Sequence, residues 1–279
     1  MNRGKFKTEF AYRIFHQKYA ISPNETWDEC CRRVVEDVCG SRWGKDRPLM
    51  GKEDRDQLTN YMMDMKFIPA GRYLFYAGRP LSFFNNCFCL KAEEDTREEW
   101  ANLASRATSA LMSGGGIGVD LSIIRPSGRT LSRTGGIASG PMPLFAILNE
   151  IGRNVMQGGS RRSAIWGGLN WQHEDIPVFL TAKNWSPLIK QCKAEDFNFP
   201  APLDMTNISV QFDTEFANRV YLGFEEFLEE DALPQLWYDC VRQMCETGEP
   251  GMTFNFWENE NENGRNACTE FISEYDSDV

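Results

Sequence analysis

Residues 113–120 read Ser-Gly-Gly-Gly-Ile-Gly-Val-Asp, and the elements on either side of them indicate the fold. Before this run, residues 97–112 have the apolar spacing of a helix that opens with the capping pattern Thr96-x-x-Glu99. After it, residues 117–123 are typical of a buried strand. A dinucleotide-binding fingerprint has its glycines after a strand and before a helix, so this order argues against a Rossmann site. The run predicts either a helix cap with a close backbone approach, or a bare strand end that a ligand can contact.

The same alternation of strand and helix continues on both sides of the glycine run. The candidate strands are residues 83–90, 117–123, 164–169, 207–212 and 252–256. The helical stretches between them are residues 97–112, 141–156, 174–184 and 223–247. Strand, helix and strand repeated four times predict right-handed crossovers, and therefore an α/β fold with five parallel strands.

The first eighty residues have helical patterns instead. Thr26-x-x-Glu29 resembles a capping box, and the helix that it opens is expected to stop at Gly40. A second helix is expected before Pro69. Three cysteines, Cys30, Cys31 and Cys39, are interpreted as part of this helical packing.

Composition excludes several classes of protein. The 279 residues carry 30 basic and 40 acidic side chains, and the net charge of -10 disfavours nucleic acid or an anionic membrane as the main partner. No apolar run is long enough to span a bilayer, and the N-terminus lacks the apolar core of a signal peptide, so we expect a cytoplasmic protein. Nine cysteines without a Cys-x-x-Cys pair, and two histidines, predict reduced thiols and no metal site.

Several cysteines and one histidine are candidates for reactive residues. A period of two places Cys87 and Cys89 on one face of the first strand, and a disulfide between them would be strained. For Cys89, and equally for Cys192 and Cys245, we expect core packing. His173 has no second histidine nearby, which favours a capping or surface role. No Gly-x-Ser-x-Gly elbow supports a serine hydrolase.

Two further features point toward ligands. The loops 125–129, 133–136 and 157–162 combine glycine with arginine, which suits phosphate binding but is equally common in surface loops. Residues 258–279 hold seven acidic residues and one basic residue, a composition typical of a solvated tail or linker. Within them, however, Asn266-Ala-Cys-Thr-Glu270 places an amide, a thiol and a carboxylate at alternate positions.

Taken in order, these motifs resemble the catalytic subunit of ribonucleotide reductase, in particular its adenosylcobalamin-dependent class. The matching segments are Phe84-Asn-Asn-Cys87, Gly114-Gly-Gly-Ile-Gly-Val-Asp120, Arg125-Pro-x-Gly128, Thr134-Gly-Gly-x-Ala-Ser-Gly-Pro141, Gln157-Gly-Gly-Ser-Arg161, Asn207-Ile-Ser-Val210 and Asn266-x-Cys-x-Glu270. The resemblance implies a ten-stranded α/β barrel built from two five-stranded halves, with the active cysteine on a finger loop. It divides the chain into a helical region 1–80, the first half-barrel 81–257, and the finger loop with a truncated end, 258–279.

The resemblance also implies roles for individual residues. Cys268 would carry the thiyl radical that abstracts the 3′-hydrogen, Glu270 would accept the 3′-hydroxyl proton, and Asn266 would orient the ribose. Cys87 would be the first thiol of the reducing pair. The implied substrate-binding residues are Asn86, Gly116 and Arg161; the implied site for a deoxynucleotide effector comprises Asp95, Arg125, Arg133 and Gln157. No residue is assigned to a metal.

The sequence departs from the family at two places. Ala267 stands where the family usually has proline, and the second thiol of the reducing pair would follow Val279. We therefore expect the N-terminal half of a split or truncated reductase that needs a complementary C-terminal fragment, adenosylcobalamin held with that fragment, a ribonucleotide substrate and a thioredoxin-like reductant. The alternatives are a fragment of an oxygen-dependent large subunit and a catalytically inactive nucleotide-binding remnant.

Overall fold

The computed structural model describes residues 4–41, 48–132, 135–155, 163–221, 233–256, 262–265, 267 and 272–274. The chain divides into two compact units, Met1–Asn86 and Cys87–Val279. Among the described helices, none combines the length and the apolar character that a bilayer span requires.

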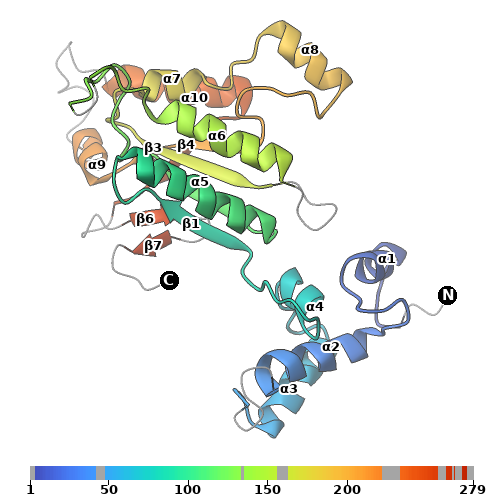
Figure 1. Ribbon diagram of the computed structural model, residues 1–279. Coiled ribbons are helices and arrows are strands. Elements are labelled where there is room, and N and C mark those ends of the chain that lie inside the picture. The colour runs from blue at the N-terminus through green and yellow to red at the C-terminus, as the bar shows by residue number, and fades with distance from the viewer. Residues whose placement is uncertain are drawn as a thin grey trace. The chain divides into compact units, whose positions relative to one another are not determined.

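The first unit is helical, as predicted. Its helices are α1 (Glu9–Lys18), α2 (Trp27–Val35), a π-helical turn (Glu36–Ser41), α3 (Lys52–Met63) and α4 (Gly71–Tyr76) (Figure 1). The predicted capping box is present: the Thr26 hydroxyl accepts from the Glu29 backbone N–H, and the Glu29 carboxylate accepts from the Thr26 backbone N–H. Cys30 and Cys31 are fully buried in the core of this unit. Burial raises the pKa of each thiol to about 12, which keeps both protonated and unreactive.

The second unit contains the predicted five-stranded parallel sheet, in the order in which the strands occur along the chain. The strands are β1 (Cys87–Lys91), β2 (Gly116–Asp120), β3 (Ile165–Asn170), β4 (Thr206–Phe212) and β5 (Gly251–Phe254). The connecting helices are α5 (Arg97–Met112), α6 (Pro141–Asn154), α7 (Ile176–Thr181), α8 (Pro187–Glu195), α9 (Thr214–Tyr221) and α10 (Leu233–Thr247) (Figure 1). Of these helices, α5, α6, α7 and α9 contact the strands directly. Sequential strand order is the topology that right-handed crossovers with helices on one side of a parallel sheet produce.

Several boundaries differ from the sequence-based expectations. The first strand begins at Cys87, because pairing with β2 starts opposite Gly116. Helices α8 and α9 were not predicted, and of the expected helix 223–247 the described part is α10; residues 222–232 lie outside the described residues. The expectation of core packing was wrong for Cys245, which is exposed, since α10 turns Cys240 toward the core instead.

The two faces of the sheet differ in character. On the helix side, apolar side chains such as Ile117, Val119 and Val210 join one core with α5, α6 and α7. At Gly167 on the same face, an added Cβ would collide with the ring of Phe145 on α6. The register places alternate residues on the opposite face, which is largely polar. Its members are Cys87, Cys89, Lys91, Gly116, Gly118, Asp120, Trp166, Gly168, Asn170, Asn207, Ser209, Gln211, Gly251 and Thr253.

A hairpin follows the sheet in the segment that composition assigned to a tail. Strands β6 (Glu262–Arg265) and β7 (Ile272–Glu274) pair antiparallel, with Arg265 opposite Ile272. Strand β6 lies against β1 and β2. For these described residues the expectation of a solvated tail was wrong, because backbone pairing and packing hold a segment that is poor in apolar side chains.

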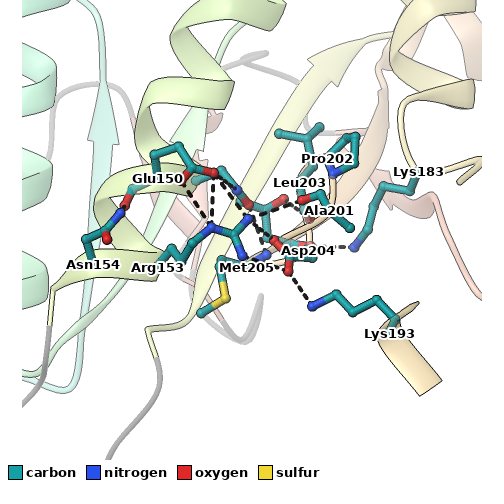
Figure 2. Close-up of polar contacts among 12 residues, drawn as sticks. Glu150, Arg153, Asn154, Lys183, Lys193, Ala201, Pro202, Leu203, Asp204 and Met205 are labelled. Carbon is teal, nitrogen blue, oxygen red and sulfur yellow. Dashed lines mark hydrogen bonds and ion pairs between the residues drawn. The ribbon is translucent and has the colours of Figure 1, made fainter. Parts of the chain in front are cut away.

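An ion-pair cluster fixes the end of the sheet at which β4 begins. The Asp204 side chain, 1% exposed, lies just before β4 and binds Arg153 of α6 and Lys193 of α8 (Figure 2). Arg153 also pairs with Glu150. Burial alone would raise the pKa of the Asp204 carboxyl, but hydrogen bonds from Arg153 and Lys193 outweigh it and hold this pKa below its ordinary value.

Replacing Asp204 with Asn tests this cluster. We expect the free energy of unfolding at pH 7 to fall by roughly 2 kcal/mol, because two cations lose a charged hydrogen-bond partner. The folded-state pKa lies below the unfolded value of about 3.9, so the stabilisation is complete above that value and is lost as the pH falls through the folded-state pKa. Urea unfolding should therefore show a smaller difference between wild type and D204N at pH 3 than at pH 7. The exposed Glu195→Gln serves as control, and an undiminished difference at pH 3 would contradict the assignment.

Candidate active site and nucleotide-binding loop

The glycine run positions the start of β2. Gly114 has a positive φ of 84°, and its N–H donates to the carbonyl of Leu111, while the N–H of Gly115 donates to that of Ala110. These two bonds form a Schellman cap on α5. An added Cβ at Gly115 would collide with the Phe88 ring of β1. Both parts of the structural prediction, a helix cap and a close backbone approach, are confirmed.

Three residues meet at the amino ends of β1 and β2. Cys87 and Gly116 are register partners and face the polar side of the sheet. Ala267, 8% exposed, covers Gly116: a Cβ added to Gly116 would lie 2.7 Å from the Ala267 Cβ and 3.3 Å from that of Ala164. The absence of a side chain at Gly116 is therefore what lets the segment after β6 reach the sheet beside Cys87.

The remaining predicted catalytic residues flank this contact in the sequence. Ala267 is the covalent neighbour of Asn266 and Cys268, and in the sequence this segment lies between the paired residues Arg265 and Ile272. Asn266, Cys268 and Glu270 themselves lie outside the described residues. Asn86 is exposed and belongs to the first unit, directly before Cys87. Arg161 lies outside the described residues.

A hydrogen-bond network covers the other end of the polar face and was not predicted. The Asp120 carboxylate accepts from Gln211 Nε2 at 3.0 Å and from the backbone N–H of Ser122 at 2.9 Å. Next to it, Asp213 accepts from Asn170 Nδ2 and Trp171 Nε1. Burial would raise the pKa of Asp213, but these hydrogen bonds lower it below its ordinary value. The strict alternation of polar and apolar residues in 207–212 was the sequence signal for this face.

Of the four predicted effector residues, the structure brings two together. Arg125 forms an ion pair with Asp95, its backbone N–H donates to the same carboxylate at 3.1 Å, and Nη2 donates to the Asp95 carbonyl at 2.9 Å. Both side chains are only partly buried. Asp95 follows β1 and Arg125 follows β2, so both lie beyond the carboxyl ends of neighbouring strands. Arg133 and Gln157 lie outside the described residues.

Within the described ranges, no group of three or more His, Cys, Asp or Glu side chains is arranged to hold a metal ion. His173 contributes hydrogen bonds instead, to the Ile124 carbonyl and from the Asp175 backbone N–H. This agrees with the capping role expected for it.

Residues 85–221 match the family model described as the barrel domain of ribonucleotide reductase. This segment, just under half of the chain, is similar to that barrel domain. The family match thus begins two residues before Cys87 and includes Asp95, Gly116 and Arg125.

Relatives of this barrel domain come from more than one class. The vitamin B12-dependent ribonucleoside-diphosphate reductase of Mycobacterium tuberculosis is 33% identical over 182 residues, which are 63% of this chain and 26% of the relative. The ribonucleoside-diphosphate reductase large subunit of Danio rerio is 28% identical over 249 residues, covering 78% of this chain and 31% of the relative. The chain spans about a quarter to a third of the length of these relatives.

A solved structure shows the same fold. The Actinobacillus ureae class Id ribonucleotide reductase alpha subunit superposes with a TM-score of 0.62 at 17% identity, covering 88% of this chain and 40% of that chain. The expectation of an α/β reductase barrel with five parallel strands after a helical region is confirmed.

A methyl group at Gly116 tests the contact with Ala267. Gly116→Ala should lower the free energy of unfolding by about 1 to 3 kcal/mol, because the new Cβ overlaps that of Ala267. The double variant G116A/A267G restores the space and should be more stable than the sum of the two single effects, as measured by urea unfolding. Strict additivity of the two substitutions would show that the residues are not in contact.

Proposed function

We propose that this chain supplies the radical-bearing half of a ribonucleotide reductase, which converts ribonucleotides into deoxyribonucleotides for DNA synthesis. The observation that carries the proposal is the packing of Ala267 on Gly116 beside Cys87. Ala267 is the covalent neighbour of Asn266 and Cys268, and we propose that these two residues act at the strand end that carries Cys87. The barrel-domain match supports the same reading.

In this proposal each thiol has a separate task. A thiyl radical at Cys268 takes the 3′-hydrogen of the ribose and returns it at the end of the cycle. Glu270 accepts the 3′-hydroxyl proton, which facilitates departure of the 2′-hydroxyl as water, while Asn266 orients the sugar. Cys87 protonates the leaving hydroxyl. Oxidation of Cys87 and a second thiol to a disulfide supplies the two electrons, and a thioredoxin-like dithiol reduces that disulfide again.

The polar face supports a ligand-filled interior. A parallel sheet whose second face carries amides, hydroxyls and carboxylates is suited to a barrel lumen that holds a polar substrate rather than to a second layer of helices. Within the described chain β1 and β5 form the edges of the sheet. Closure of the barrel requires further strands, which we assign to a complementary half on the same or another polypeptide. Asn86, Gly116 and Arg161 are proposed to contact the substrate.

We further propose that the enzyme is cytoplasmic and belongs to the adenosylcobalamin-dependent class, supported by the 33% identity to the M. tuberculosis relative. When bound, adenosylcobalamin supplies the radical that generates the thiyl on Cys268. We assign its binding to the complementary half, so no step above depends on cofactor contacts in this chain. The second candidate is an oxygen-dependent large subunit, favoured by the longer alignment with the D. rerio protein.

The test is reconstitution. The chain is co-expressed with the second half-barrel of a B12-dependent relative, and deoxynucleotide formation is measured with and without adenosylcobalamin. We expect turnover that needs both halves and the cofactor. Cys268→Ser should reduce turnover at least a thousandfold, since a hydroxyl does not replace the thiol as a hydrogen-atom carrier, whereas the exposed Cys245→Ser should leave it within about twofold.

The controls distinguish the alternatives. Turnover without cobalamin, but with a radical-generating metal subunit, would assign the chain to the oxygen-dependent class. Nucleotide binding without turnover, whichever half is supplied, would identify a catalytically inactive remnant. An active C268S variant would contradict the radical mechanism itself.

A further inference from the structure

The loop between β2 and α6 is held by residues of another loop, the one that follows β3. Ser127 is bound twice by Asp175: its backbone N–H donates to Oδ2 at 2.9 Å and its hydroxyl donates to Oδ1 at 2.7 Å. Asp175 is 6% exposed and lies 48 positions further along the chain. Both carboxylate oxygens are therefore committed to one residue of a distant loop.

The Asp175 side chain binds Ser127 and does not cap its own helix, α7. It is the N-cap residue of α7, where aspartate ordinarily accepts from a backbone N–H of its own helix. Its side chain makes no such bond here. The preceding turn is held instead by His173, whose Nδ1 accepts from the Asp175 N–H at 3.1 Å. Because the Asp175 carboxylate binds no backbone N–H of α7, we attribute its orientation to the two hydrogen bonds from Ser127.

The Asp175 carboxylate also lies close to the far end of this loop, and His173 binds its near end. At Gly140, the N-cap of α6, φ is +76°, and an added Cβ would collide with Asp175 Oδ2 and lie 3.0 Å from the Ser127 nitrogen. At the other end, His173 Nε2 donates to the carbonyl of Ile124 at 2.7 Å. Because Nδ1 accepts and Nε2 donates, the hydrogen bonds assign the neutral Nε2–H tautomer to His173.

The segment held in this way leads directly to Arg125. Ile124 and Ser127 lie on either side of Arg125-Pro126, and a small hairpin follows, in which Gly128 N–H donates to the Ala138 carbonyl and Thr130 bridges Ile137. Arg125 in turn pairs with Asp95. Anchors on both sides of a two-residue stretch restrict the directions in which the guanidinium can point.

We propose that Asp175, assisted by His173, is a positioning residue that holds Arg125 and Asp95 in the geometry needed to bind a deoxynucleoside triphosphate. This inference rests on the proposed reductase function and on the deoxynucleotide effector site that the family resemblance implies at Asp95 and Arg125. Asp175 acts through Ser127 and the backbone and does not touch the nucleotide. The guanidinium supplies planar donors for phosphate, and the clamp removes the entropic cost of ordering the loop on binding.

Nucleotide binding by variants of the full chain tests the clamp. Calorimetric titration with dATP, dGTP and dTTP should show binding that Arg125→Ala weakens strongly. Asp175→Asn, which keeps the shape but loses the charged acceptor, should weaken binding about tenfold. Glu174→Gln, at the residue next to Asp175, is the matched control. It removes an exposed ion pair with Arg129 and should change the affinity less than twofold.

A double variant separates positioning from general destabilisation. If Asp175 acts through Arg125, then D175N should add almost nothing in the R125A background, whereas a purely structural role would give the same loss in both backgrounds. Ser127→Ala should reproduce part of the D175N effect and Ser127→Thr should largely retain affinity. Additive losses, or full affinity in D175N, would overturn the proposal.

Hydrogen exchange tests the clamp without a nucleotide. In D175N the amides of Ser127 and of the hairpin residues Gly128 and Leu131 should exchange at least tenfold faster than in wild type, while those of α5 remain protected. Unchanged exchange would overturn the clamp whether or not nucleotides bind. Wild-type chain that fails to bind any of the three nucleotides would instead refute the assigned effector site.

Discussion

The contact between Ala267 and the bare backbone of Gly116 is the interaction on which the candidate active site depends. It needs three conditions at once: a helix that ends in a glycine cap, a strand that begins without a side chain, and a hairpin that reaches the polar face of the sheet. Only together do these conditions bring Ala267 next to the strand end that carries Cys87. Any larger residue at position 116 would occupy the space that the hairpin uses.

The two faces of the sheet differ in polarity, and both proposed sites lie at ends of its strands. Its apolar face is sealed by helices into one core. Its other face carries polar groups, several of which bind one another by hydrogen bonds. Burying such groups costs free energy unless protein, water or a substrate supplies hydrogen-bond partners. The amino ends of β1 and β2 lie beside Ala267, whereas the carboxyl ends of the same strands lead to Asp95 and Arg125. Two strands thus connect a proposed catalytic centre at one end with a proposed regulatory site at the other.

Prediction from sequence succeeded where the signal was local. The Thr26 capping box, the helix from Arg97 to Met112 and the cap at Gly114 each depend on residues within one or two turns, and all are present in the structure. It failed at Cys245 and at helices α8 and α9, and composition alone did not indicate the hairpin after residue 257. In these cases burial, amphipathic packing and strand pairing depend on partners distant in sequence, which composition and short-range periodicity do not encode.

By itself, the sequence determined the α/β alternation, the five strands and the ordered motifs that resemble a reductase, because periodicity, caps and glycine placement are properties of neighbouring residues. Only the tertiary structure decided that Ala267 covers Gly116 and that Arg125 pairs with Asp95. It also decided that the Asp175 carboxylate binds Ser127 and does not cap α7. Those contacts join residues from 30 to about 150 positions apart. Their formation depends on sheet register and loop geometry, which exist only once the whole second unit has folded.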